Sequence, residues 1–325
     1  MYKRAEPTTP EERYGKLVNF LWTTEKGVYP LEILPTLVDL ANQGIKYPKV
    51  LAITASGQIL DWVASLYGRV GRVDFVDFKP GQNLYVAYKL ANVCRCRTPQ
   101  EFFGRLLNAD TDGVVRDLNH AMMFFPELLR YPETYGIDVR EVANFFVCRK
   151  DARGKDRFSQ EFLTPYNLRH FFLEYEPWYR SLRDTAMRGV FHFYCDKIEG
   201  LSPATEEKYH VVYLSDTHAW ADRGKLARNL SKLVAPGGWF QSAFFGSDCV
   251  GFIEYGRRDE EFRRVVEQLG EFDTYFPFNR RTERVKSQVR KMLRLNEKQW
   301  SELKDEVLGA FPEKQQVPFA GQRKY

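Results

Sequence analysis

The chain alternates between short apolar runs of strand length and longer stretches in which apolar residues recur at helical spacing. The predicted strands cover residues 49–54, 72–76, 190–194, 209–214 and 239–245. The predicted helices that connect them cover residues 59–67, 80–92 and 225–233. A strand, a helix and a further strand in this order form a parallel unit whose helices cover the sheet. The order therefore predicts an α/β fold with a doubly wound, Rossmann-like sheet.

Two parts of the chain interrupt this alternation. Helical patterns over residues 9–27 and 31–42 precede the first strand. Between the second and third strands, the chain holds only helical patterns, at residues 99–107, 114–129, 139–146 and 168–188. We therefore predict three parts: an N-terminal helical lid (1–48), a Rossmann-like cofactor-binding domain (49–96 and 190–325), and a helical insertion (97–189) that covers the active site.

Charge and composition exclude several classes of protein. The chain has 48 Lys and Arg against 43 Asp and Glu, and a net charge of +5 does not argue for a nucleic-acid partner. No segment approaches the ~18–20 apolar residues that span a bilayer, and the polar residues 1–13 do not resemble a secretory signal. The 5 cysteines are few and odd in number, as in proteins of reducing compartments. We expect a cytoplasmic protein with a small-molecule substrate.

Polar residues follow each predicted strand of the parallel sheet. In such sheets, ligands bind beyond the carboxyl ends of the strands, where the strand order reverses. Gly57 allows a ligand to approach the backbone closely, because it has no Cβ atom. Asp77 is placed to accept hydrogen bonds from a ribose diol, and Asp196 to accept one from an adenine amino group. The predicted contacts at the ends of the strands are Ala55, Ser56, Gly57, Asp77, Asp196, Ser215 and Asp216.

The turn after the first strand does not have the pattern of a phosphate-binding loop. Residues 54–58 contain a single glycine, whereas a dinucleotide site has the pattern G-x-G-x-x-G. A Walker sequence, with its Gly-Lys-Ser or Gly-Lys-Thr, is also absent from the sequence. The turn therefore predicts a site for an adenosyl group without phosphates.

Two segments resemble the class I S-adenosylmethionine-dependent methyltransferases. They are Val73-Asp-Phe-Val-Asp77 and the turn Leu233-Val-Ala-Pro-Gly-Gly238. The resemblance covers about residues 49–96 and 190–250, and it implies S-adenosylmethionine as cofactor or substrate. The next residues along the chain, Phe78 and Lys197, join Asp77 and Asp196 in the site that it implies.

A narrower group within that fold is similar at more positions. The matching segments are Ile53–Gly57 with Leu60-Asp61, Val76–Pro80 with Gln82-Asn83, Glu101–Phe103, and Tyr213–Asp216. They resemble the betaine-lipid-type 3-amino-3-carboxypropyl transferases. This resemblance implies attack at the cofactor's Cγ, with release of methylthioadenosine, and transfer to a small acceptor.

Internal cyclisation is a second possible reaction at Cγ. If the lid and the insertion close over the site, the cofactor's own amino group could attack Cγ and form azetidine-2-carboxylate, the reaction of azetidine-2-carboxylate synthases. Asn144 and Tyr175 are the candidates for orienting that amine. Two alternatives stay open, a methyltransferase and a catalytically inactive cofactor-binding protein.

His218 is the histidine that we consider as a catalytic base, since it lies two residues after Asp216. The 5 histidines are scattered without the spacing of metal ligands, so we expect no metal.

Positive charge is concentrated in a separate segment, residues 280–294, where seven basic residues accompany a single acidic residue, Glu283. This predicted helix is either a solvated face over the core or a weak contact for an anionic membrane.

Overall fold

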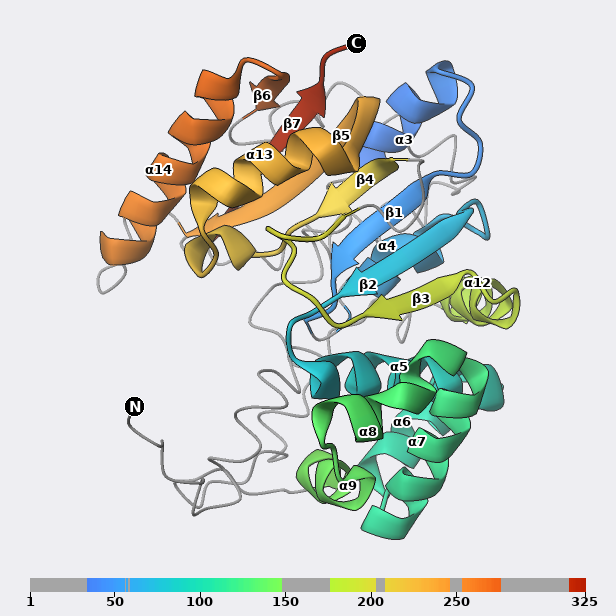
Figure 1. Cartoon of the computed structure of the whole chain (residues 1–325). Coiled ribbons are helices and arrows are strands. Elements are labelled where there is room, and N and C mark those ends of the chain that lie inside the picture. Colours follow the sequence, from blue (N-terminus) through green and yellow to red (C-terminus); the bar gives the residue numbers. More distant parts are fainter. Residues whose placement is uncertain are drawn as a thin grey trace, which may run out of the picture.

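The computed structural model describes residues 34–55, 57, 59–147, 176–202, 208–245, 253–275 and 316–325. These residues form a seven-stranded sheet with the order β3-β2-β1-β4-β5-β7-β6 (Figure 1). Strands β1 to β5 are parallel, and β7 is antiparallel to both of its neighbours, β5 and β6. This order is that of the class I methyltransferase fold, which confirms the predicted fold class.

The strands are β1 (Lys49–Ile53), β2 (Arg72–Val76), β3 (Phe191–Tyr194), β4 (Tyr209–Tyr213), β5 (Val234–Phe245), β6 (Phe272–Tyr275) and β7 (Gln316–Arg323). The α-helices are α3 (Leu34–Asn42), α4 (Ile59–Ser65), α5 (Pro80–Arg95), α6 (Pro99–Leu107), α7 (Thr111–Phe124), α8 (Tyr131–Tyr135), α9 (Val139–Val147), α12 (Glu176–Met187), α13 (Arg223–Leu233) and α14 (Ile253–Leu269). Two 3₁₀ helices are η1 (Pro126–Arg130) and η2 (Thr217–Ala219).

Alternate residues of the central strands enter two separate hydrophobic cores. Val50, Ala52, Val211 and Tyr213 belong to the core that contains α4, α5 and α12, whereas Leu51, Val212 and Leu214 belong to the core under α13 and α14. Successive side chains of a strand point to opposite faces, so a sheet with helices on both faces buries both sets. The two helical layers are visible on either side of the sheet in Figure 1.

The predicted segment 114–129 is not one helix. α7 begins earlier, at Thr111, because Asp110 caps it by accepting a hydrogen bond from the Gly113 backbone at 2.6 Å. It ends at Phe124, and η1 follows from Pro126, since proline has no backbone N–H to continue the helix. The predicted turn at residues 235–238 lies inside β5, where the pairing with β4 shifts register between Tyr209 and Val211.

α5 is enclosed on all sides. Every residue from Pro80 to Cys94 is buried, because the sheet lies against one side of the helix and α6, α7, α9 and α12 surround the rest. Polar side chains of this helix, including Gln82, Asn83 and Lys89, are therefore buried as well. Figure 1 shows the neighbouring helices gathered beside β3.

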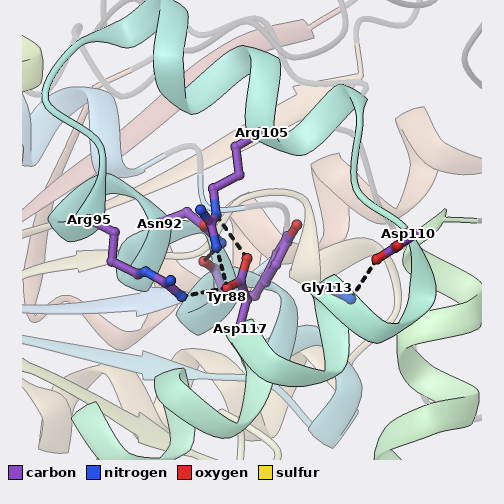
Figure 2. Close-up of polar contacts among 7 residues, drawn as sticks. All are labelled: Tyr88, Asn92, Arg95, Arg105, Asp110, Gly113 and Asp117. Carbon is purple, nitrogen blue, oxygen red and sulfur yellow. Dashed lines mark hydrogen bonds and ion pairs between the residues drawn. The ribbon is translucent and has the colours of Figure 1, made fainter.

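An ion-pair cluster joins three of these helices (Figure 2). Asp117 of α7 is 3% exposed, and its carboxylate accepts from Arg95 of α5 at 2.5 Å and from Arg105 of α6 at 2.7 and 3.0 Å. A carboxylate that binds two guanidinium groups holds their helices in a fixed orientation.

The division of the chain into lid, Rossmann-like domain and insertion stays a prediction, and the segments 1–33 and 280–294 lie outside the described residues. Within the described part of the chain, no helix has both the length and the apolar character needed to cross a membrane.

Candidate functional site

The carboxyl ends of β1, β2 and β3 are joined by backbone hydrogen bonds. The N–H of Thr54 donates to the carbonyl of Val76 at 3.0 Å, and the N–H of Asp77 donates to the carbonyl of Tyr194 at 3.1 Å. The N–H of Asp196 then donates to the carbonyl of Asp77 at 3.1 Å. The sheet thus brings the predicted contacts after these three strands to one edge. β1 and β4 are parallel neighbours here: β2 and β3 are added on one side of β1 and β4 and β5 on the other, so the strand order reverses between β1 and β4, as at a ligand-binding switch point.

The turn between β1 and α4 adopts a left-handed backbone. The φ angles of Ala55 and Gly57 are +39° and +86°. A Cβ atom on Gly57 would lie 3.2 Å from Val86 Cγ2 and 3.3 Å from Leu60 Cδ1, so only glycine fits without displacing its neighbours. The left-handed Ala55 costs about 1–3 kcal/mol, and Gln82 of α5 stabilises it by donating to its carbonyl. Ser56 lies outside the described residues.

Asp77 supplies a buried negative charge at the end of β2. Its side chain is 8% exposed, and its Oδ1 accepts from the Lys79 N–H at 3.0 Å. Burial raises the pKa of Asp77 to about 6, while backbone hydrogen bonds from Lys79 and Ala55 and the Lys79 charge act in the opposite direction. The carboxyl group is therefore ionised at neutral pH and can accept hydrogen bonds from a pair of hydroxyl groups.

Sequence reasoning missed a polar network that supports this edge from below. The Thr54 hydroxyl donates to Asn83 Oδ1 at 2.5 Å, and Asn83 Nδ2 donates to the Tyr131 hydroxyl at 3.0 Å and to the Tyr194 carbonyl at 2.9 Å. Asn83 thus connects the ends of β1 and β3 with α8. The only sequence signal was that Gln82 and Asn83 are polar residues within the first turn of a helix that follows Asp77.

The edge beyond β3 is more exposed. Asp196 is exposed, and its Oδ1 accepts from the Lys197 N–H at 2.7 Å. Cys195 Sγ lies 3.7 Å from the carbonyl of Phe78, and the Phe78 side chain is 54% exposed. The Phe78 ring, with the Lys79 ammonium 5.8 Å from its centroid, adds an apolar surface to the same edge as the Asp77 and Asp196 carboxylates. An adenine ring needs both.

β4 ends in a second strained residue. Ser215 has a φ of +53° and is buried, and its hydroxyl donates to Asp216 Oδ1 at 3.3 Å. Asp216 is half-buried, and its other oxygen lies 3.5 Å from Trp220 Nε1. Strained non-glycine residues occur at both central strand ends, Ala55 after β1 and Ser215 after β4, which is typical of functional sites.

Of the three predicted catalytic residues, the structure describes His218 and Asn144. His218 is 0% exposed, and its ring nitrogens lie within hydrogen-bond distance of Asp259 and Ser242, so the structure does not present this imidazole to a substrate as the catalytic base that we considered. Asn144 is exposed on α9, where its Oδ1 accepts from the Thr111 hydroxyl at 2.7 Å. Tyr175 lies outside the described residues, so its role stays a prediction. Within the described ranges, no group of three His, Cys, Asp or Glu side chains is arranged to hold a metal ion.

No protein-family model matches the chain, and no curated protein matches its sequence. Among solved structures, the N-methyltransferase NodS from Bradyrhizobium japonicum WM9 is 7% identical, with a TM-score of 0.36 over 91% of this chain and 95% of its own. The plantazolicin methyltransferase BpumL in complex with SAH is 9% identical, with a TM-score of 0.38 over 92% of this chain and 86% of its own. Phosphoethanolamine N-methyltransferase 2 from Haemonchus contortus, in complex with S-adenosyl-L-methionine, is 11% identical, with a TM-score of 0.33 over 92% of this chain and 56% of its own. At these TM-scores the similarities add no argument, and the fold assignment rests on the strand order.

Proposed function

We propose that the protein binds S-adenosylmethionine at the carboxyl ends of β1 to β4 and is an enzyme that acts on it. The observation that carries the proposal is Asp77, a buried carboxylate at the end of β2, beside the left-handed turn of Ala55 and Gly57. A ribose diol offers two hydroxyl donors to such a carboxylate. The glycine backbone of this turn, which carries no Cβ atom, would let the methionine part of the cofactor approach closely.

The remaining strand ends supply the other contacts in this proposal. Asp196 and the exposed ring of Phe78 would hold the adenine, and Lys197 follows Asp196 at the same edge. Ser215 and Asp216 would face the part of the cofactor near the end of β4. When bound, the cofactor supplies a sulfonium with three electrophilic carbons; the protein's task is to orient one of them toward a nucleophile and to exclude water.

Within this activity, we propose reaction at Cγ, with release of methylthioadenosine. The support is the resemblance to 3-amino-3-carboxypropyl transferases, together with the positions of two residues that carry it. Gln82 donates to the Ala55 carbonyl, and Asn83 binds the Thr54 hydroxyl, so both stabilise the turn that would face the methionine part. The nucleophile is either a small acceptor or the cofactor's own amino group. A methyltransferase is the alternative.

Product analysis separates these reactions. The full chain is incubated with S-adenosylmethionine alone, and the products are separated by mass spectrometry. Methylthioadenosine together with azetidine-2-carboxylate would establish cyclisation, and methylthioadenosine only in the presence of an added acceptor would establish transfer. S-adenosylhomocysteine as the product would overturn the Cγ proposal and leave a methyltransferase. Binding without any turnover would identify a cofactor-binding protein.

The Asp77→Asn variant shows whether the reaction depends on the proposed site. The matched control is Asp222→Asn, because Asp222 also accepts a backbone N–H, from Lys225 at 2.9 Å, at the exposed start of α13. Asparagine caps helices about as well as aspartate, so this control keeps its local structure. We expect product formation to fall at least tenfold in Asp77→Asn and to stay unchanged in Asp222→Asn.

A further inference from the structure

A buried chain of polar side chains lies behind the end of β4. Asp259 Oδ1 of α14 lies 2.6 Å from His218 Nε2, and His218 Nδ1 lies 2.7 Å from Ser242 Oγ of β5. Ser242 Oγ also lies 3.2 Å from the carbonyl oxygen of Ser215, the strained residue at the end of β4. All four residues are buried, with exposures between 0% and 3%.

The number of protons on the Asp259–His218 pair determines where the Ser242 hydroxyl points. A serine hydroxyl has one hydrogen, so Ser242 can donate either to the Ser215 carbonyl or to His218 Nδ1. If the pair holds a single proton, it lies between Nε2 and Oδ1, and Nδ1 is an acceptor that takes the Ser242 hydrogen. If the pair holds a second proton, Nδ1 carries it and donates to Ser242 Oγ. The Ser242 hydrogen then goes to Ser215.

Both short contacts of Ser242 are satisfied together only in the second state. The surroundings of the imidazole are consistent with it, because the Asp259 carboxylate can compensate an imidazolium charge. Two further charged residues lie next to this part of the chain: Arg258 of α14, whose Nη1 donates to the Ala219 carbonyl at 2.6 Å, and Asp216, which precedes η2. The Phe262 ring of α14 stacks on the imidazole with centroids 5.2 Å apart and excludes water from that face.

An Asp, a His and a Ser in sequence along a hydrogen-bonded chain resemble a hydrolytic triad in connectivity. However, Ser242 is 0% exposed and lies within β5, between β4 and β7, so no substrate can approach its hydroxyl. A nucleophilic serine must be accessible to the carbonyl that it attacks. The chain ends instead on a backbone carbonyl at the edge of the candidate site, which indicates a positioning role.

We propose that the Asp259–His218 pair holds two protons and thereby directs the Ser242 hydroxyl onto Ser215, which makes His218, Asp259 and Ser242 positioning residues for the β4 end of the cofactor site. The hydrogen bond to its carbonyl holds Ser215 in the left-handed conformation, and this conformation sets the place of the adjacent Asp216. The effect on cofactor binding rests on the proposed function, whereas the protonation state of His218 is independent of it.

The first test measures the protonation of His218 directly by ¹⁵N NMR of the imidazole nitrogens in the full chain at pH 7. His210 provides an internal reference, because its Nδ1 accepts from the Lys49 backbone N–H at 2.9 Å and is therefore unprotonated. The His218→Asn variant assigns the His218 signals. We expect His218 Nδ1 to have the shift of a protonated nitrogen. An unprotonated Nδ1, as in His210, would overturn the proposal.

The second test measures the affinity for S-adenosylhomocysteine by calorimetry in wild type and Ser242→Ala. We expect Ser242→Ala to bind about three- to tenfold more weakly, the effect of one lost hydrogen bond. The matched control is Ser231→Ala in α13, whose buried hydroxyl has no partner among the described residues, and it should bind like wild type.

Equal affinities of wild type and Ser242→Ala at pH 7 would overturn the positioning role. If the wild-type protein binds neither S-adenosylmethionine nor S-adenosylhomocysteine, the proposed function is wrong, whereas the NMR result still decides whether the pair holds two protons. His218→Asn adds a further check, because its amide can donate to Ser242 in place of Nδ1. It should therefore keep affinity within about twofold of wild type, and a loss as large as that of Ser242→Ala would contradict the proposal.

Discussion

The Asp77 carboxylate accepts a hydrogen bond from the Lys79 backbone N–H at 3.0 Å, at the end of β2, where Asp77 is 8% exposed. The hydrogen bond favours the ionised form, but burial disfavours it more strongly, and the net result is a pKa of about 6. A buried carboxylate whose ionised form is disfavoured in this way is typical of functional sites.

We predict that Asp77→Asn stabilises the protein in the absence of cofactor. The folded pKa of Asp77 is raised from 3.8 to about 6, so its contribution to stability is fully present below about pH 3.8 and is lost as pH rises through 6. Removing the charge should raise the free energy of unfolding at pH 7.5 by about 1–3 kcal/mol. The upper end of this range is the free energy that corresponds to the shift of the Asp77 pKa from 3.8 to about 6. Urea unfolding at pH 7.5 and pH 5 measures this, with a smaller gain at pH 5. A destabilised variant at pH 7.5 would contradict it.

We predict that Gly57→Ala weakens the turn between β1 and α4. The variant places a Cβ atom 3.2 Å from Val86 and forces alanine to a φ of +86°, so unfolding should be easier by about 1–3 kcal/mol. The control is Gly104→Ala in α6, where a Cβ atom meets no neighbour within 4 Å, and it should stabilise by up to about 1 kcal/mol. Thermal unfolding of both variants tests this prediction. Equal melting temperatures for Gly57→Ala and Gly104→Ala would show that the left-handed turn is not required.

We predict that Tyr131→Phe destabilises the protein by about 1–2 kcal/mol, because it removes the acceptor of a buried Asn83 N–H. Tyr135→Phe in the same helix is the control, since the Tyr135 side chain is 39% exposed and water can replace its partners. Hydrogen exchange should also show faster opening of α8 in Tyr131→Phe. If both variants unfold at the same urea concentration, Asn83 does not depend on α8.

We predict that Asp117→Asn loosens the helices around α5 and costs about 1–3 kcal/mol, because Arg95 and Arg105 lose their shared carboxylate (Figure 2). The guanidinium groups are 38–40% exposed, which limits the cost. Asp112→Asn is the control on the same helix: its pair with Arg140 is 63–64% exposed and should be worth under about 0.5 kcal/mol. Equal urea midpoints for the two variants would contradict the prediction.

Much of the fold could be predicted because strand and helix periods are local properties of the sequence. The strand 72–76, the helix 99–107 and the position of Asp77 at a strand end were all predicted correctly. Pro126 marks the end of α7 in the sequence as well, but the apolar spacing on both sides of it favours one continuous helix.

The candidate site could be predicted only in part, because its supporting contacts join distant residues. Asn83 binds Tyr131 across 48 positions, and His218 binds Asp259 across 41 and Ser242 across 24. A polar residue in a helical pattern gives no indication of whether helices later in the chain will bury it, as α8 helps to bury Asn83. His218 follows Asp216 in sequence, yet η2 turns it into the core against α14, and the local pattern could not show this.

The measurement that tests the central claim most directly is calorimetry of S-adenosylmethionine binding to wild type and Asp77→Asn between pH 5 and pH 8. Ribose hydroxyls that donate to Asp77 stabilise its ionised form, so wild-type affinity should fall as pH drops through about 6, and binding at pH 6 should release protons into the buffer. Asp77→Asn should bind about 5- to 100-fold more weakly at pH 7.5, with no change in affinity from this group as pH falls. Equal affinities for the two proteins at pH 7.5, or no binding to either, would contradict the placement of the cofactor at the end of β2.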